Sequence, residues 1–212
     1  MPFNPTLPTW LAVNACNSTS STGNTDTRTG LAIQGGNLVP GDYFDLTNDE
    51  ANRLSYPTNG ILYAGRYRWV QVDSGATAAN VKTGTIGVMP SLAVVSASPL
   101  GTKNPPLSIV TSYDQSLGGA VGLRPVVFLN TVTPGNWTFI QELGIATVLG
   151  KAASFTGSPA NGVIVGSYTA GLVDVPTSTT AVTSTSLGIA IDSPVAATLF
   201  RILLQYVPVV QG

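Results

Sequence analysis

The chain has 212 residues, of which 43% are hydrophobic and only 9% are charged, with nine basic and ten acidic side chains. Such sparse, balanced charge provides no basic stripe for nucleic-acid phosphates, so nucleic-acid binding is not expected. The polar surface must instead come from Ser, Thr, Asn and Gln, which lose little hydration free energy when a partner buries them. We therefore expect a protein that works in an assembly.

The start of the chain and its hydropathy predict a soluble protein that is made in the cytoplasm. MPFNPTLPTW lacks the basic region and the apolar region of a secretory signal. No run of eighteen apolar residues occurs, and a membrane-spanning helix needs about that many. The single cysteine, Cys16, has no basic neighbours and is expected to be a small buried or half-buried residue, not a nucleophile.

Residues 1–10 are predicted to form an extended N-terminal arm. Their three prolines exclude a helix, because proline fixes φ and lacks an amide donor. Between the prolines, Phe3, Leu7 and Trp10 have no evident local partner, so they are candidates for contact with a neighbouring subunit. Loose packing on their own domain is the alternative. A polar tract over residues 14–30 is expected to be a surface loop.

One short helix and many short strands are expected in the rest of the chain. Thr47 and Glu50 have the spacing of a capping box, which begins a helix, and Pro57 would end it. Ala51, on this helix, could face the core. Bursts of β-branched and aromatic residues between turns predict strands at 60–63, 67–72, 85–88, 92–96, 108–111, 125–129, 138–143, 146–149, 162–168, 172–175, 188–191 and 197–207. This pattern is typical of an all-β protein built from barrels or sandwiches.

A repeated pattern predicts two related lobes. Residues 64–71, AGRYRWVQ, align with residues 134–141, PGNWTFIQ, and the glycine, both aromatics and the glutamine keep register. Aromatics at every second position share one strand face, where they can cover an end of a small barrel. Chance likeness of two ordinary strands is the alternative. The expected order is an arm with a polar loop, a first β-barrel or sandwich-like lobe, a linker and a second such lobe, at residues 1–30, 31–100, 101–124 and 125–212.

The residue types that catalysis needs are scarce. There is no histidine, which removes the commonest general base and metal ligand at neutral pH. The chain has two glutamates, and Glu142 is expected to be a surface residue, not an acid in a pocket. A carboxylate pair of the glycosidase kind is therefore not expected. We expect no enzyme activity and no cofactor.

Two charged clusters remain as candidate sites. The acidic cluster contains Asp42, Asp45, Asp49 and Glu50. Such oxygens can bind calcium, but their spacing is not that of a calcium loop and acids are expected at a helix N-terminus, so no metal is expected. Arg66 and Arg68 share one strand face and could clamp a carboxylate of a partner subunit. The alternative for the arginines is a solvated edge strand that its charge protects from aggregation.

Three segments resemble capsid decoration (cement) proteins of tailed bacteriophages. They are GNWTFIQ at 135–141 with Gly144 and Ala146 after it, GIAID at 188–192, and ATLFRILL at 197–204. The first is similar to a strand that is followed in that family by a glycine turn and a second strand. The other two are similar to the family's usual ending. The likeness is best over residues 125–207 and weaker over residues 60–89.

The resemblance implies a structural virion protein. Such a protein would bind the capsid exterior after synthesis in the host cytoplasm, bridge copies of the major capsid protein, and assemble as a homotrimer with extended terminal arms. A tail- or fibre-associated β module that binds a carbohydrate or receptor is the main alternative. Its aromatic side chains would stack on the sugar, although Trp69 and Trp137 are expected in the core. An enzyme is the least expected class.

Overall fold

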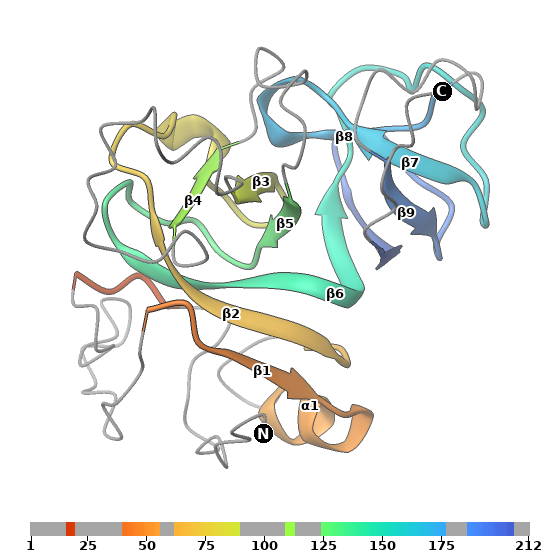
Figure 1. Cartoon of the computed structure of the whole chain (residues 1–212). Coiled ribbons are helices and arrows are strands. Elements are labelled where there is room, and N and C mark those ends of the chain that lie inside the picture. Colours follow the sequence, from red (N-terminus) through yellow and green to blue (C-terminus); the bar gives the residue numbers. More distant parts are fainter. Residues whose placement is uncertain are drawn as a thin grey trace, which may run out of the picture.

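The computed structural model describes residues 16–19, 40–55, 62–89, 109–112, 124–176 and 186–205. In this part the chain is mostly β with one α-helix, α1 (Asn48–Ser55), and two 3₁₀ turns, η2 (Ala78–Asn80) and η5 (Thr169–Gly171) (Figure 1). The strands are β1 (Tyr43–Leu46), β2 (Gly65–Val72), β3 (Ile86–Met89), β4 (Ile109–Ser112), β5 (Arg124–Phe128), β6 (Trp137–Leu149), β7 (Ile164–Ser167), β8 (Val173–Asp174), β9 (Ser186–Ala190) and β10 (Leu199–Leu204). The prediction of a mostly β chain with a single short helix is confirmed.

Five strands close into a barrel. β2, β4, β3, β5 and β6 follow one another, and β6 pairs back onto β2. Neighbouring strands are antiparallel except β2 and β4, which are parallel. Val70, Val126 and Ile140 belong to the cluster that fills the barrel and are fully buried. Closure leaves these five strands without a free edge, which removes a common site of aggregation.

The second half of β6 leaves the barrel and begins another sheet (Figure 1). The strand turns at Gly144, where φ is +97° and a Cβ would lie 2.3 Å from the Ala64 carbonyl oxygen. Beyond this point β6 pairs with β10, and β9, β7 and β8 follow in that order. The Lys151 amide donates to the Val173 carbonyl (3.0 Å), so β8 lies beside the residues that directly follow β6. One long strand is thus common to the barrel and the second sheet.

The two echoed segments are neighbours in the barrel and do not occupy equivalent places in two lobes. They lie on β2 and the first half of β6, which pair antiparallel with Trp69 opposite Phe139. The barrel also combines strands from both sides of the predicted linker. The echo has a simpler physical cause, because both strands present their aromatics to one hydrophobic cluster outside the barrel. Trp69 and Trp137 are 0% and 5% exposed, so their expected place in the core is confirmed.

β1 and α1 cover this aromatic cluster. Phe44 of β1 stacks on Tyr67 with 5.5 Å between ring centroids, and Ala51 of α1 is buried in the same cluster. The predicted capping box begins α1: the Thr47 amide donates to Glu50 Oε2 (2.9 Å) and the Glu50 amide donates to Thr47 Oγ1 (3.3 Å). Local sequence therefore specifies the helix, and tertiary packing holds it on the barrel.

The strand predictions differ from the structure in three places. The predicted strands 138–143 and 146–149 are one continuous strand, because Gly144 bends β6 without ending it. No strand is predicted where β1 lies. Leu62 and Tyr63, from the predicted strand 60–63, lie outside any strand. The predicted strand at 92–96 falls outside the described residues.

Candidate functional site

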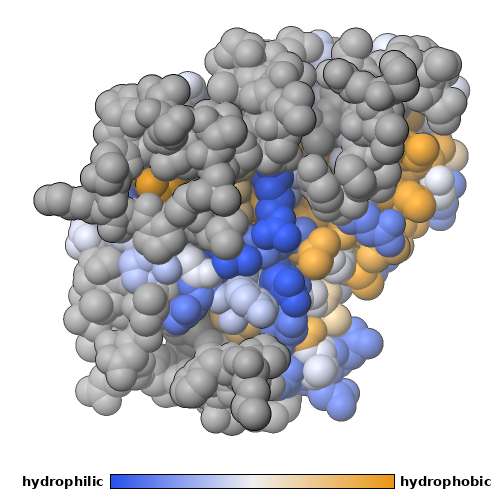
Figure 2. All heavy atoms as spheres, in the orientation of Figure 1, coloured by the Kyte–Doolittle hydropathy of each residue, from blue (hydrophilic) through white to orange (hydrophobic). Residues whose placement is uncertain are grey.

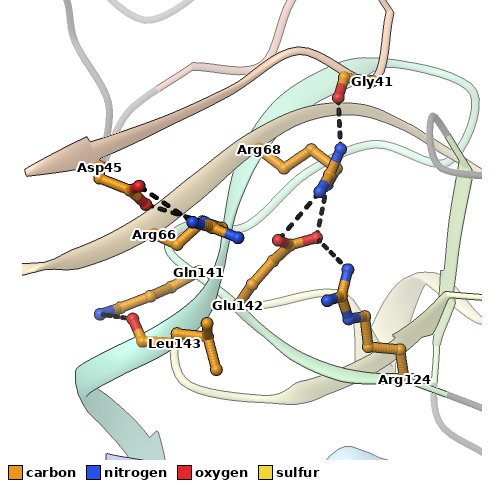
Figure 3. A network of polar contacts seen from close by, with 8 residues as sticks. All are labelled: Gly41, Asp45, Arg66, Arg68, Arg124, Gln141, Glu142 and Leu143. Carbon is orange, nitrogen blue, oxygen red and sulfur yellow. Dashed lines mark hydrogen bonds and ion pairs between the residues drawn. The ribbon is translucent and has the colours of Figure 1, made fainter. Parts of the chain in front are cut away.

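A buried ion-pair network joins three strands of the barrel. Arg68 on β2 donates to Glu142 on β6 through Nε (2.5 Å to Oε1) and Nη2 (3.1 Å to Oε2). The Arg68 side chain is 6% exposed and the Glu142 side chain is 0% exposed. Arg124 on β5 approaches the same carboxylate, with Nη1 3.4 Å from Oε1. We call Arg68, Glu142 and Arg124 the Glu142 network, and Figure 3 shows its two guanidinium groups on opposite sides of the carboxylate.

The prediction that Glu142 is a surface residue is wrong, and a β-bulge explains its burial. Tyr67 lies opposite Gln141 and Arg66 lies opposite Leu143, so Glu142 has no residue across from it on β2. A bulge inserts one extra residue and re-aims its side chain. The Gln141 side chain stabilises the distortion, because its Nε2 donates to the Ile145 carbonyl (2.7 Å). The carboxylate can therefore reach the guanidinium groups on β2 and β5.

Gly65 allows β2 to approach the bulge. A Cβ at this position would lie 2.2 Å from the Leu143 carbonyl oxygen and 2.8 Å from Gln141 Nε2. The Leu143 oxygen belongs to the backbone and lies closer than a Cβ contact allows, so only glycine fits. The glycine that the sequence echo singles out at the start of β2 thus has a packing role. It keeps the two strands paired where the register changes.

Arg66 and Arg68 lie on one face of β2, but each is paired with a different carboxylate of its own chain. Arg66 donates to Asp45 on β1 through Nε (2.8 Å) and Nη2 (3.0 Å). Both guanidinium groups also lie over the Tyr43 ring, at 4.4 Å for Arg66 and 5.2 Å for Arg68. The hydrogen bonds from Arg66 hold the pKa of the Asp45 carboxyl below its ordinary 3.8. Because β2 is flanked by β1 and β6, the edge-strand alternative is wrong.

Arg68 has one further acceptor and Arg124 is the most accessible member of the network. Arg68 Nη1 donates to the carbonyl of Gly41, at the start of the segment that leads into β1. The Arg124 side chain is 38% exposed. Both Glu142 oxygens accept hydrogen bonds from guanidinium groups, so the role of this carboxylate is to hold three strands together. Arg124, which has solvent access, is the member that can also meet an external anion.

A second ion pair closes the other sheet. Lys151 Nζ lies 2.8 Å from Asp174 Oδ2, and these side chains are 9% and 12% exposed. The Thr156 amide donates to Asp174 Oδ1 (2.9 Å), and the Thr156 hydroxyl also contacts the carboxylate. Burial acts to raise the pKa of Asp174, but the hydrogen bonds from Lys151 and Thr156 outweigh it and the pKa lies below the ordinary 3.8. This pair fixes the residues after β6 to β8.

The charged residues of the described part serve mainly to join strands. Besides the pairs above, Arg201 of β10 pairs with Asp192 (2.6 Å) in the turn after β9. In the acidic cluster, Asp45 accepts from Arg66 and Glu50 belongs to the helix cap. Within the described ranges, no three His, Cys, Asp or Glu side chains lie together as a metal site would require. None of the helical residues described there forms a segment long and apolar enough to cross a membrane.

The chain before the barrel is tied to it at Cys16–Ser18. The Asn130 side chain donates to the Cys16 carbonyl (2.8 Å), and Cys16 is buried as expected. Asn17 Oδ1 accepts from the Asn136 side chain (2.8 Å). Ser18 exchanges backbone hydrogen bonds with Trp137, the first residue of β6 (2.9 and 2.6 Å). The predicted contact residues Phe3, Leu7 and Trp10 lie outside the described residues.

Sequence reasoning missed Glu142 and Arg124 as a site. The available signal was a lone acid in an apolar run followed by glycine, since QELG is a sequence in which a bulge can form. Comparison with known protein families, with curated proteins and with solved structures gives no match for this chain.

Proposed function

We propose that this protein is a structural component of a virion, which binds the outside of a bacteriophage capsid and cements neighbouring copies of the major capsid protein. The observation that carries the proposal is the arrangement of the three segments that resemble capsid decoration proteins. β10, which carries the third segment, pairs with β9, which carries the second, and with residues 144–149 of β6. Residues 137–141 of the first segment lie on the barrel half of the same strand β6. A likeness between separate short motifs is weak, but these motifs lie on three neighbouring strands.

The glycines of these segments support the same interpretation. Gly135, Gly144 and Gly188 have φ of +90°, +97° and +155°. A Cβ on Gly188 would lie 1.9 Å from the Leu203 carbonyl oxygen, whereas a Cβ on Gly135 would meet nothing within 4 Å. The motif glycines are therefore required by the backbone of this sheet, by its close packing or by its turns. Glycines that the backbone geometry requires are the kind of residue that a family of assembly proteins with one fold would share, which supports the proposal.

The distribution of charge suits permanent burial against other subunits. Five cations, Arg66, Arg68, Arg124, Lys151 and Arg201, are paired within the chain, whereas Lys82 is exposed and forms no ion pair with the described residues. A surface of neutral polar and apolar groups can be buried without the large desolvation cost of free charges. Contacts of this kind stabilise an assembled shell by mass action, because they form only on the assembled state.

The N-terminal segment is proposed to reach a neighbouring subunit. Its junction with the barrel is fixed at Cys16–Ser18, beside the start of β6. A fully extended segment of fifteen residues spans up to roughly 50 Å, which is further than the width of one small domain. Phe3, Leu7 and Trp10 would then supply apolar anchors on the neighbour. Several such weak contacts in a homotrimer would act together through avidity.

The test is co-sedimentation with heads that lack decoration. Purified protein is mixed with expanded, undecorated heads, and the heads are pelleted and assayed for bound protein. Saturable binding and heads that resist heat or osmotic shock better are expected. No co-sedimentation at any protein concentration would overturn the proposal. Glycan-array binding in its place would favour the carbohydrate-binding alternative, although the buried Trp69 and Trp137 cannot serve that alternative as stacking platforms.

A further inference from the structure

The Glu142 network lies at one end of the barrel interior. Arg68 and Arg124 are each two positions along their strand from a residue that fills the barrel, Val70 and Val126 respectively. Residues two apart on a strand point to the same side. Arg124 is also the first residue of β5. The two guanidinium groups therefore lie where the apolar interior ends, with the Glu142 carboxylate between them (Figure 3).

The network holds one more positive charge than negative charge. Two guanidinium groups share the single carboxylate of Glu142, and Arg68 engages both of its oxygens. The neighbouring Arg66 does not alter this balance, because Asp45 neutralises it. In the part of the chain that the structure describes, Glu142 is the one acid that pairs with Arg124. An excess charge beside an apolar interior is unfavourable, and a bound anion would offset it.

Arg124 has the donors that such an anion requires. Its contact with Glu142 is a single one at 3.4 Å, and its side chain is 38% exposed. Among the described residues, its guanidinium forms no other hydrogen bond. Figure 3 shows the rest of this group turned away from the carboxylate. Figure 2 shows strongly hydrophilic side chains gathered in the middle of the visible face, in the region of β5 and β2. A planar fork of N–H donors is thus open to solvent.

We propose that Arg124 binds a carboxylate at this end of the barrel. One carboxylate carries the single negative charge that balances the network, and its two oxygens match the parallel donors of a guanidinium group. A phosphate dianion would exceed that balance, and the nearby Glu142 would repel the surplus charge. The carboxylate belongs either to an acidic group of a partner protein or to a small organic acid. This inference does not depend on capsid binding.

The test titrates the protein with sodium acetate and follows the arginine Nε–H groups by NMR, with sodium chloride added to keep the ionic strength constant. Three proteins are compared: the unmodified chain, Arg124→Gln and the control Arg201→Gln. The Arg201 side chain is 43% exposed, much like that of Arg124, but its guanidinium is paired one-to-one with Asp192 through both carboxylate oxygens. The control therefore removes an arginine of similar exposure that carries no excess charge.

Acetate should shift the Arg124 resonance saturably in the unmodified chain and in the control. Arg124→Gln should bind acetate about tenfold more weakly or worse, because it loses both the charge and the fork. Arg124→Lys, which keeps only the charge, should lie between them. Circular dichroism and thermal melting check folding, which Arg124→Gln should retain because Arg68 still pairs with Glu142. If Arg124→Gln does not fold, the Arg124 resonance and the lysine variant decide.

Three results would overturn the inference: no saturable shift of the Arg124 resonance, undiminished acetate binding by folded Arg124→Gln, or binding of phosphate in place of acetate. A capped tripeptide with a central aspartate, beside its asparagine counterpart, distinguishes the two sources. Aspartate-dependent binding at least as tight as that of acetate identifies a partner protein, and binding of acetate alone identifies a small acid. A chain that binds heads but no carboxylate would overturn this inference and leave the proposed function standing.

Discussion

Arg68 and Glu142 are separated by 74 positions in the sequence, yet they form a two-pronged ion pair inside a closed barrel. A carboxylate that is removed from water needs such a partner, because desolvation of an isolated charge costs several kcal/mol. The pair ties β2 to β6, the two strands whose pairing closes the barrel.

Replacement of Glu142 by glutamine should destabilise the protein by about 3–5 kcal/mol, because Arg68 would remain buried without a counter-charge. Urea denaturation of Glu142→Gln and of the unmodified chain measures this difference in unfolding free energy. The matched control is Asp45→Asn, since Asp45 also pairs with an arginine of β2 but its side chain is 57% exposed. The control should cost less than about 1 kcal/mol. Equal losses in the two variants would contradict the special role of the buried pair.

The pH dependence of stability should include a contribution from Asp174. Its pKa is lower in the folded state than the ordinary 3.8, so the carboxylate stabilises the fold above the pKa of the unfolded chain. This contribution is lost as the pH falls through the folded-state pKa. We expect Asp174→Asn to lose about 2 kcal/mol at neutral pH, and the difference from the unmodified chain to shrink under acid conditions. Urea unfolding of both proteins at a series of pH values tests this, and a difference that does not change with pH would contradict it.

Alanine at Gly188 should disrupt the second sheet. Its Cβ would lie 1.9 Å from the backbone oxygen of Leu203, which cannot move without breaking the pairing of β9 and β10. The control is Gly162→Ala, where φ is +79° but nothing lies within 4 Å of the added Cβ. That control should cost about 1 kcal/mol through backbone strain alone. Soluble yield and melting temperature report the difference, and a Gly188→Ala protein as stable as the control would show that the strands adjust freely.

Glycine at Ala197 should stabilise the chain. Ala197 has φ of +58°, a left-handed conformation that an alanine adopts only at a cost. Relief of this strain outweighs the added flexibility of the unfolded chain, so we expect a gain of about 0.5 kcal/mol in unfolding free energy. Ala146→Gly, at a buried strand position with ordinary geometry, should instead lose about 1 kcal/mol. Chemical denaturation of both variants measures the contrast, and a loss at position 197 would refute the strain argument.

Deletion of residues 2–10 should weaken binding to heads more than it lowers the melting temperature. The reason is that the barrel holds the chain at Cys16–Ser18, beyond the deleted segment. Co-sedimentation and thermal melting of the deleted and full-length proteins separate the two effects. A drop in melting temperature with unchanged binding would mean that the segment packs on its own domain.

The features that could be read from the sequence are those that local chemistry specifies. The Thr47–Glu50 cap, the aromatic strand of β2 and the buried tryptophans follow from spacing and residue type alone. β1 was not predictable in this way, because its four residues include Asp45 and form a strand only through pairing with β2. The burial of Glu142 likewise depends on a bulge and on arginines from two other strands. Long-range register, and not local propensity, decides both.

The strand β6 has a mechanical consequence. Its thirteen residues belong to the barrel on one side of Gly144 and to the second sheet on the other. A force applied to one sheet is therefore transmitted through the backbone of β6 to the hydrogen bonds of the other sheet. No flexible linker separates the two halves of this strand. The two sheets should therefore unfold together under force, and β6 should act as a rigid link between the partners that the two sheets bind.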